Sequence, residues 1–110
     1  MEAVAAVVMN RVRRPGWWGH DVVSVCRAPW QFSCWNAGGA NHAAMLAVTG
    51  ADPAFVTALL VAQEAIGGRL ADRTGGADSY YAEGSPMPRW AAGRTPTAVI
   101  GGQIFFRTEA

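Results

Sequence analysis

The residues that could do chemistry gather between positions 15 and 36, around the stretch Gln31-Phe32-Ser33-Cys34-Trp35-Asn36. Sugar rings offer flat C–H faces that pack on aromatic side chains, and hydroxyls that hydrogen-bond to neutral polar groups. A loop that mixes aromatic and neutral polar side chains therefore suits a sugar-binding cleft. The alternative is that the aromatics only form the core of a small domain. The polar members are His20, Gln31 and Ser33, and the aromatic members are Trp17, Trp18, Trp30, Phe32 and Trp35.

Cleavage of a glycosidic bond needs a carboxyl group in a partly desolvated cleft, where it stays protonated near neutral pH. Glu64, Asp78 and Glu83 are eligible. Glu83 is the best placed, because its loop follows two tyrosines and leads to Trp90. Its alternative role is that of an exposed loop residue.

Other chemistries find little support. The sequence holds no nucleophile elbow, P-loop, dinucleotide fingerprint or HExxH motif. Cys26 and Cys34 flank Pro29, so a turn could join them in a disulfide, or both could be buried thiols. No zinc-type ligand spacing accompanies them, and we expect neither a metal nor a cofactor.

Composition limits the partners and the domain count. The 110 residues predict a single domain, and 51% hydrophobic against 15% charged residues excludes a disordered chain. The net charge is +1 and the arginines are scattered, so we expect no nucleic-acid partner. No apolar run reaches membrane-span length, and residues 1–12 do not read as a signal peptide.

Hydrophobic periodicity predicts a mainly helical α+β domain. Two short strands should pair in a small antiparallel sheet, the second of them with a bulge or close backbone approach at Gly101-Gly102. Asp21 and Asp52 are the expected N-caps of two of the helices. Helices are expected over 3–12, 22–27, weakly over 41–48, and over 53–66, with strands over 78–82 and 99–106.

The first helix has no capping residue in front of it, since Met1 already lies inside the apolar pattern. We therefore expect the natural helix, or an element before it, to extend N-terminal to Met1. A frayed, uncapped helix end is the alternative.

Several stretches together resemble the SleB/CwlJ-type cell wall hydrolases, a family named for enzymes that degrade spore cortex during germination. The order and spacing of these stretches hold over essentially the whole chain. They are AVAAVVMNRV at 3–12, VVSVC at 22–26, PWQFSCWN at 29–36, TGGADSYY at 74–81, Pro88 with Trp90, and IGGQIFF at 100–106.

The resemblance implies a lysozyme-like α+β domain that cleaves the bond between N-acetylmuramic acid and N-acetylglucosamine in peptidoglycan. In the best-known members the reaction is that of a lytic transglycosylase, in which one glutamic acid suffices and no metal is required. The substrate lies outside the cytoplasmic membrane, so the resemblance implies a place in the cell envelope.

One element of the family pattern does not match. The family's glutamate lies in a GEARGE-like segment ahead of the AVAxVVxNR helix, which here would precede Met1, and Glu2 does not fit that motif. We expect a domain shortened at its N-terminus, with Glu83 as a fallback acid. The alternative is an inactive glycan-binding or structural relative. Loss of a helix would also expose the apolar face of 3–12 and favour self-association.

Carried over by position, the resemblance implies a cleft lined by residues from three stretches. Tyr80 and Tyr81 alternate in direction along a strand, so only one should face the cleft, and Tyr81 is our choice. Gln103 stands where relatives often have a histidine. The expected lining residues are Gln31, Phe32, Ser33, Tyr80, Tyr81 and Trp90.

Overall fold

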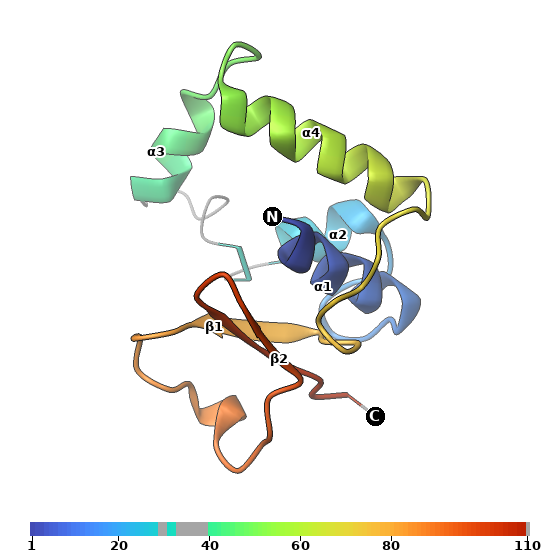
Figure 1. Cartoon of the computed structure of the whole chain (residues 1–110), viewed down its shortest axis with the longest axis vertical. Coiled ribbons are helices and arrows are strands. Elements are labelled where there is room, and N and C mark those ends of the chain that lie inside the picture. Colours follow the sequence, from blue (N-terminus) through green and yellow to red (C-terminus); the bar gives the residue numbers. More distant parts are fainter. Residues whose placement is uncertain (29–30, 33–39, 110) are drawn as a thin grey trace.

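The structure is a computed structural model that describes residues 1–28, 31–32 and 40–109. It has the mixed α+β architecture that the sequence predicts, with the α-helices on one side of a small antiparallel sheet (Figure 1). The elements are α1 (Glu2–Arg13), α2 (Val22–Arg27), α3 (Ala40–Leu46), α4 (Pro53–Ile66), β1 (Ser79–Ala82), the 3-10 helix η2 (Arg89–Ala91), β2 (Ala98–Ile100) and β3 (Gln103–Phe106).

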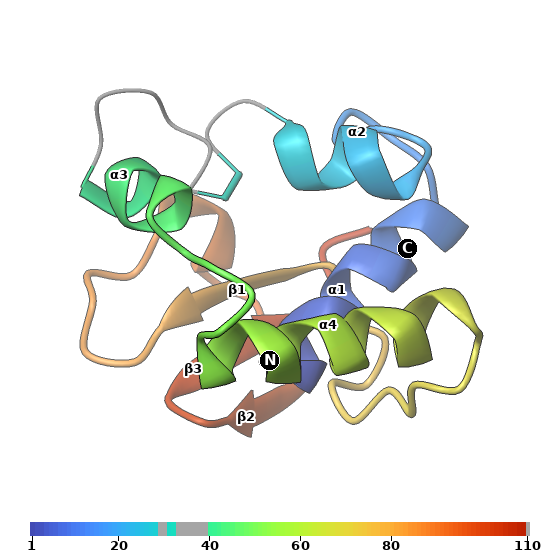
Figure 2. The same cartoon turned by 90° about the horizontal axis from the view of Figure 1, so that it is seen from above.

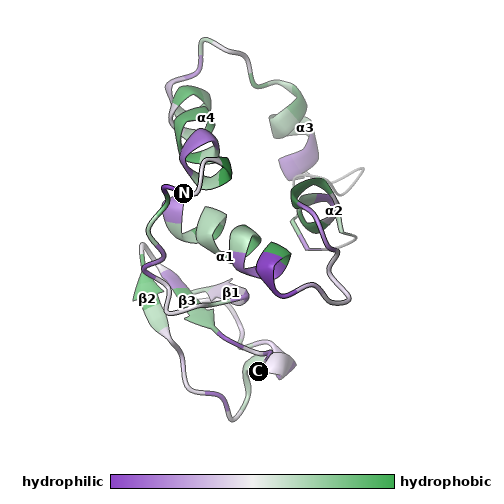
Figure 3. Ribbon diagram, turned by 90° about the vertical axis from the view of Figure 1, so that its right-hand side faces the viewer, coloured by the Kyte–Doolittle hydropathy of each residue, from purple (hydrophilic) through white to green (hydrophobic). Residues whose placement is uncertain are grey.

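Helix α1 lies at the centre of the molecule, between the sheet on one side and α2 and α4 on the other (Figure 3). Val7 packs with Ala77 and Phe105 on the sheet side. Val8 packs with Trp18 and Val25 on the α2 side. The two valines are adjacent in sequence, so one helix links two small apolar cores. The helix predicted over 3–12 is confirmed.

Helix α2 begins where the sequence places its cap. The Asp21 carboxylate accepts a hydrogen bond of 2.8 Å from the Ser24 backbone N–H, and the Ser24 hydroxyl bonds back to the Asp21 backbone N–H. This reciprocal capping box satisfies two backbone donors at the helix start.

Helix α4 is confirmed, but its predicted cap is wrong in detail. The Asp52 carboxylate accepts from the Thr49 backbone N–H at 2.8 Å and makes no bond to its own helix. Pro53 at the first helical position lacks an N–H, which removes one donor that a cap would otherwise satisfy. In the view from above, α4 crosses beside the start of α1 (Figure 2).

The sheet has three strands in the order β1-β3-β2, all antiparallel, where we expected two strands. The predicted strand over 99–106 divides into β2 and β3 at Gly101-Gly102, which forms a hairpin turn in place of a bulge. Both glycines have positive φ, 57° and 79°. A two-residue turn that matches the strand twist needs positive φ at both central positions, and paired glycines supply it.

None of the helices in the described ranges is long and apolar enough to cross a membrane.

Candidate functional site

A cavity of about 470 Å³ lies where α1, the segment 31–32, β1, η2 and residues 108–109 meet. We call it the aromatic cavity. Its wall combines aromatic rings with amide, hydroxyl and guanidinium groups, which is the mixture that the sequence predicts for a sugar-binding site. The lining residues are Arg11, Trp17, Gln31, Phe32, Ser79, Tyr80, Trp90, Arg94, Thr108 and Glu109.

Most of the expected substrate-binding residues meet in this cavity. Gln31, Phe32, Tyr80 and Trp90 come from three separate parts of the chain, and all four line it. Ser33 lies outside the described residues, as do Trp30 and Trp35. Segments that are distant in sequence therefore converge on one site.

Of the two tyrosines, Tyr80 lines the aromatic cavity and Tyr81, our choice for the cleft, does not. Tyr80 lines the cavity and packs against Phe105, its partner across the sheet, with ring centroids 5.5 Å apart. Tyr81 points to the opposite face, where it stacks on Phe106 at 5.8 Å and meets the Trp90 edge at 6.1 Å. The alternation along β1 holds, but the face toward α1 belongs to Tyr80.

The carboxylates considered as acids are not gathered here. Glu83 is exposed in the turn after β1, where its backbone N–H donates to the Gly102 carbonyl, and it does not line the aromatic cavity. Glu64 is exposed near the end of α4. The cavity wall contains the carboxylate of Glu109, which is also exposed.

Arg11 organises the cavity, and the sequence analysis did not identify it. Its Nη1 donates to Gln31 Oε1 at 3.3 Å, and its Nε donates to the Asp78 carbonyl at 2.6 Å. Its guanidinium carbon also lies 5.2 Å from the centre of the Trp18 ring and 5.8 Å from that of Phe32. Arg11 thus holds both described members of the Gln-Phe-Ser stretch against the wall.

The charge of Arg11 is held in a desolvated place. Only 5% of the residue is exposed, and this burial lowers the pKa of the guanidinium, while the nearby Asp78 partly opposes the shift. The pKa of arginine is high enough for the group to stay protonated. A signal for this residue did exist: Arg11 lies four positions after Val7 and three after Val8, on the buried stripe of the helix.

The loop that leads into β1 is fixed by Asn10 and Asp72. Asn10 Nδ2 donates to Asp72 Oδ2 at 3.0 Å and to the Ala77 carbonyl at 2.9 Å. Asp72 also accepts from the Thr74 and Gly76 backbone N–H groups. Burial alone would raise the pKa of Asp72, but the hydrogen bonds from Thr74, Asn10 and Gly76 outweigh it and lower the pKa.

Asp78 is a structural anchor. Its carboxylate accepts from the Thr108 hydroxyl at 2.7 Å, the Thr108 backbone N–H at 3.0 Å and the Glu109 backbone N–H at 3.0 Å. Burial opposes its ionisation, but hydrogen bonds from Thr108, Glu109 and Ser79 lower its pKa. A lowered pKa suits an anchor and is the opposite of what a proton donor needs.

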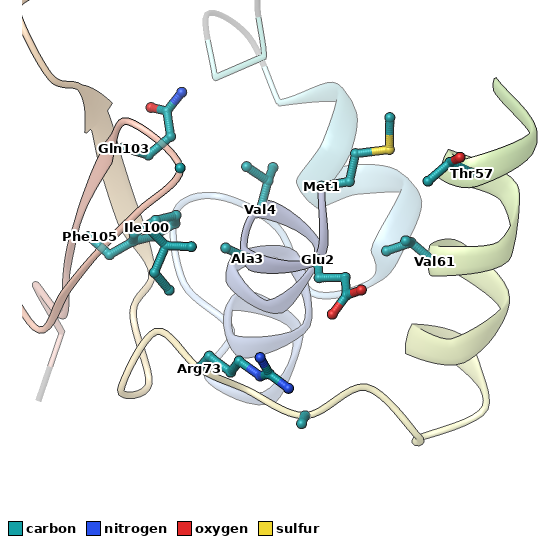
Figure 4. A pocket seen from close by; sticks show the side chains of 12 residues that line it. Met1, Glu2, Ala3, Val4, Thr57, Val61, Arg73, Ile100, Gln103 and Phe105 are labelled. Carbon is teal, nitrogen blue, oxygen red and sulfur yellow. The ribbon is translucent and has the colours of Figure 1, made fainter. Parts of the chain in front are cut away.

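A larger cavity, of about 530 Å³, lies beside the first turn of α1. Figure 4 shows it bounded by Ala3 and Val4 of α1, Ile100 and Phe105 of the sheet, and Val61 of α4. Its wall is mostly aliphatic, and the ring of Phe105 is fully buried, so the wall offers no exposed ring face of the kind on which a sugar stacks. Gln103, which stands at the position where the resemblance implies a histidine in many relatives, is part of this wall.

Cys26 packs against the cluster of Val8, Trp18 and Val25, but Cys34 lies outside the described residues, so the disulfide and the two buried thiols both stay predictions. In residues 1–28, 31–32 and 40–109, no three His, Cys, Asp or Glu side chains gather in a way that could hold a metal ion.

Comparison with known proteins identifies the family. Searches against curated proteins and against solved structures gave no match. The family model described as Cell Wall Hydrolase matches residues 1–106, which is nearly the whole chain. The stretch it covers includes α1, Gln31, Phe32 and the complete sheet. The chain therefore belongs to the SleB/CwlJ-type cell wall hydrolase family.

Proposed function

We propose that this domain is a peptidoglycan hydrolase that binds the glycan strand in the aromatic cavity and cleaves the bond between N-acetylmuramic acid and N-acetylglucosamine. The observation that carries the proposal is the convergence of Gln31, Phe32, Tyr80 and Trp90 on one cavity. Membership of the cell wall hydrolase family supplies the substrate class.

The cavity offers complementary contacts for such a strand. The rings of Phe32, Tyr80 and Trp90 would pack on pyranose C–H faces. The Gln31 amide can both donate and accept, so it suits an acetamido group or a hydroxyl. Arg11 Nη1 already donates a hydrogen bond to Gln31 Oε1. The amide nitrogen of Gln31 therefore remains to donate to the sugar.

The reaction we propose is that of a lytic transglycosylase with one glutamic acid. The acid gives its proton to the glycosidic oxygen as the bond to the muramic anomeric carbon breaks. The muramic 6-hydroxyl then attacks that carbon and closes an anhydro ring, and its proton returns to the glutamate. The carboxyl group needs a raised pKa, and Asp72 and Asp78 have lowered ones. Neither carboxylate therefore suits the acid, so Glu83 stays the fallback within residues 1–110, and the family resemblance favours a glutamate ahead of the helix at 3–12.

A second candidate function is glycan binding without cleavage by residues 1–110. The observation that favours it is that Glu64, Asp78 and Glu83, the carboxylates considered as acids, do not line the aromatic cavity. Under either function the partner is peptidoglycan, and the place of action is the cell envelope.

The test is a digest of purified peptidoglycan by two proteins: residues 1–110, and the same chain preceded by the in-frame upstream residues. Mass spectrometry would measure anhydro-muropeptides. Product from the extended protein alone supports the upstream acid. Product from both makes Glu83→Gln the next variant, with Glu64→Gln as a matched exposed control. If neither protein gives product while residues 1–110 bind glycan, cleavage is rejected in favour of binding.

A further inference from the structure

A further cavity, of about 300 Å³, adjoins the aromatic cavity. We call it the turn cavity. One of its lining residues, Arg14, has a side-chain nitrogen without a hydrogen-bond partner in the described part of the chain. The two cavities share Trp17 and Glu109, so they are neighbours along one surface. Its size is at the lower end of ligand sites. The lining residues are Arg14, Pro15, Gly16, Trp17, Trp18 and Glu109.

Trp17 stands at the border between the two cavities on a rigid turn. The Gly19 N–H donates to the Gly16 carbonyl at 3.1 Å, which closes the turn and places the two tryptophans at its tip. Trp18 points inward, 1% exposed, and its Nε1 donates to the Arg11 carbonyl at 3.1 Å. Trp17 leans on Trp18 with ring centroids 5.3 Å apart, yet is 68% exposed.

An exposed indole on a fixed support is a stacking platform. Two χ angles are all that Trp17 has to lose on binding, and its partner Trp18 is already immobile, so ordering the ring costs little entropy. The large exposed area of Trp17 is otherwise unfavourable in water.

Arg14, which lines the same cavity, has an unused hydrogen-bond donor. Its Nη2 donates to the Gly76 carbonyl, which fixes the guanidinium. Its Nη1 is buried and has no hydrogen-bond partner within the described part of the chain. A buried guanidinium N–H without an acceptor is costly, so an arriving carbonyl or carboxylate oxygen would satisfy it.

We propose that the turn cavity is a second sugar subsite, which binds an N-acetylated sugar adjacent to the disaccharide in the aromatic cavity. Trp17 stacks on the pyranose, Arg14 Nη1 donates to the acetamido carbonyl, and the Glu109 carboxylate accepts from a ring hydroxyl. The inference rests on the proposed glycan-binding function and extends it to a stated length of strand. It also assigns recognition of the acetyl group to Arg14.

The test is calorimetric binding of chitobiose and chitotetraose to residues 1–110. Trp17→Ala should weaken tetramer binding about tenfold and dimer binding distinctly less, because Trp17 borders the aromatic cavity but stacks on the sugar in the turn cavity. Phe55→Ala on α4 removes an exposed aromatic outside both cavities and should change neither. Equal loss for both lengths would place Trp17 in the aromatic cavity alone and overturn the second subsite. An unchanged tetramer affinity would overturn it as well.

The role of Arg14 is tested by the choice of sugar. Arg14→Ala should weaken chitotetraose binding about tenfold but hardly affect cellotetraose, which lacks acetamido groups. Arg69→Ala is the matched control, because Arg69 follows α4 and lines neither cavity. Equal losses for both sugars would reject acetyl recognition. If a muropeptide that carries a stem peptide binds more tightly than chitotetraose, and Arg14→Ala weakens the binding of that ligand alone, Arg14 recognises a stem-peptide carboxylate and not the acetyl group. If wild type binds no sugar, the proposed function fails together with the subsite.

Discussion

The guanidinium of Arg11 donates a hydrogen bond of 3.3 Å to the side-chain oxygen of Gln31 across 20 residues of sequence. The same group donates to the backbone carbonyl of Asp78, immediately before β1. One buried cation in α1 therefore sets the distance between the Gln31 segment and the strand that carries Tyr80, which are two walls of the aromatic cavity.

Replacement of Arg11 by lysine should weaken sugar binding as well as stability. An ammonium group keeps the charge but cannot make both bonds in the planar geometry of a guanidinium. We expect a loss of about 1–3 kcal/mol in the free energy of unfolding, measured in urea. Chitotetraose binding should also fall at temperatures where the variant stays folded. The control Arg13→Lys changes an exposed position, and equal effects of the two variants would contradict the role of Arg11.

Asp78 should make stability depend on acid. Its pKa is lower in the folded protein than the ordinary value of about 3.9, so its contribution is present at neutral pH and is lost as the pH falls through the folded value. Asp78→Asn should cost about 1–3 kcal/mol at pH 7, because the amide offers one acceptor oxygen to several donors. The variant should lose less further stability between pH 5 and acid than wild type, as read by urea unfolding at each pH. The role of Asp78 is contradicted if the stability of Asp78→Asn falls with pH in parallel with that of wild type. It is also contradicted if the exposed control Glu64→Gln gives the same pH dependence as Asp78→Asn.

Gly19 should be far less replaceable than Gly50. Gly19 has φ of +117°, and a Cβ there would lie 2.6 Å from Ser24 Oγ and 3.0 Å from the Ser24 backbone. Gly19→Ala should therefore destabilise by about 1–3 kcal/mol. It should also displace Trp17, visible as a shift in its fluorescence. A Cβ at Gly50 meets nothing within 4 Å, so Gly50→Ala should be close to neutral in the same denaturation assay. If Gly19→Ala costs no more stability than Gly50→Ala, the turn tolerates a side chain and the prediction is wrong.

We expect residues 1–110 to self-associate through α4 and not through the apolar face of 3–12, because Val7 and Val8 of that face are buried. The helix is apolar along much of its length (Figure 3), and its exposed side chains include Phe55, Val56, Leu59 and Leu60, with 42% to 56% of their surfaces in water. Apolar patches of this kind mark association surfaces. Sedimentation velocity should show a concentration-dependent dimer that Leu60→Glu weakens and Val23→Glu, an exposed change on α2, does not. A monomer over the whole concentration range would reject this expectation.

The sequence predicted what local patterns determine. The apolar stripe of 3–12, the Asp21 cap and the Pro53 start each act within one or two helical turns, so their residues identify α1, α2 and α4. The resemblance then grouped Gln31, Phe32, Tyr80 and Trp90, which line the aromatic cavity and which no periodicity could have joined.

The remaining features depend on contacts between distant residues. The paired glycines permit either a bulge or a hairpin, and only the pairing of β2 with β3 selects the hairpin. Likewise, the face of β1 that turns toward α1 decides between Tyr80 and Tyr81. The polar bonds of Asn10 and Arg11 reach residues 62 to 67 positions away, so their partners leave no local signature.

These long-range bonds also bear on how the chain folds. The α1–α2 pair and the β2–β3 hairpin each form from neighbouring residues, but β1 docks on α1 only after a loop of some sixty residues has closed. Closing such a loop costs entropy before the bonds of Asn10 and Arg11 form. We therefore expect the docking of β1 to limit the folding rate, and the aromatic cavity to be among the last features to take shape.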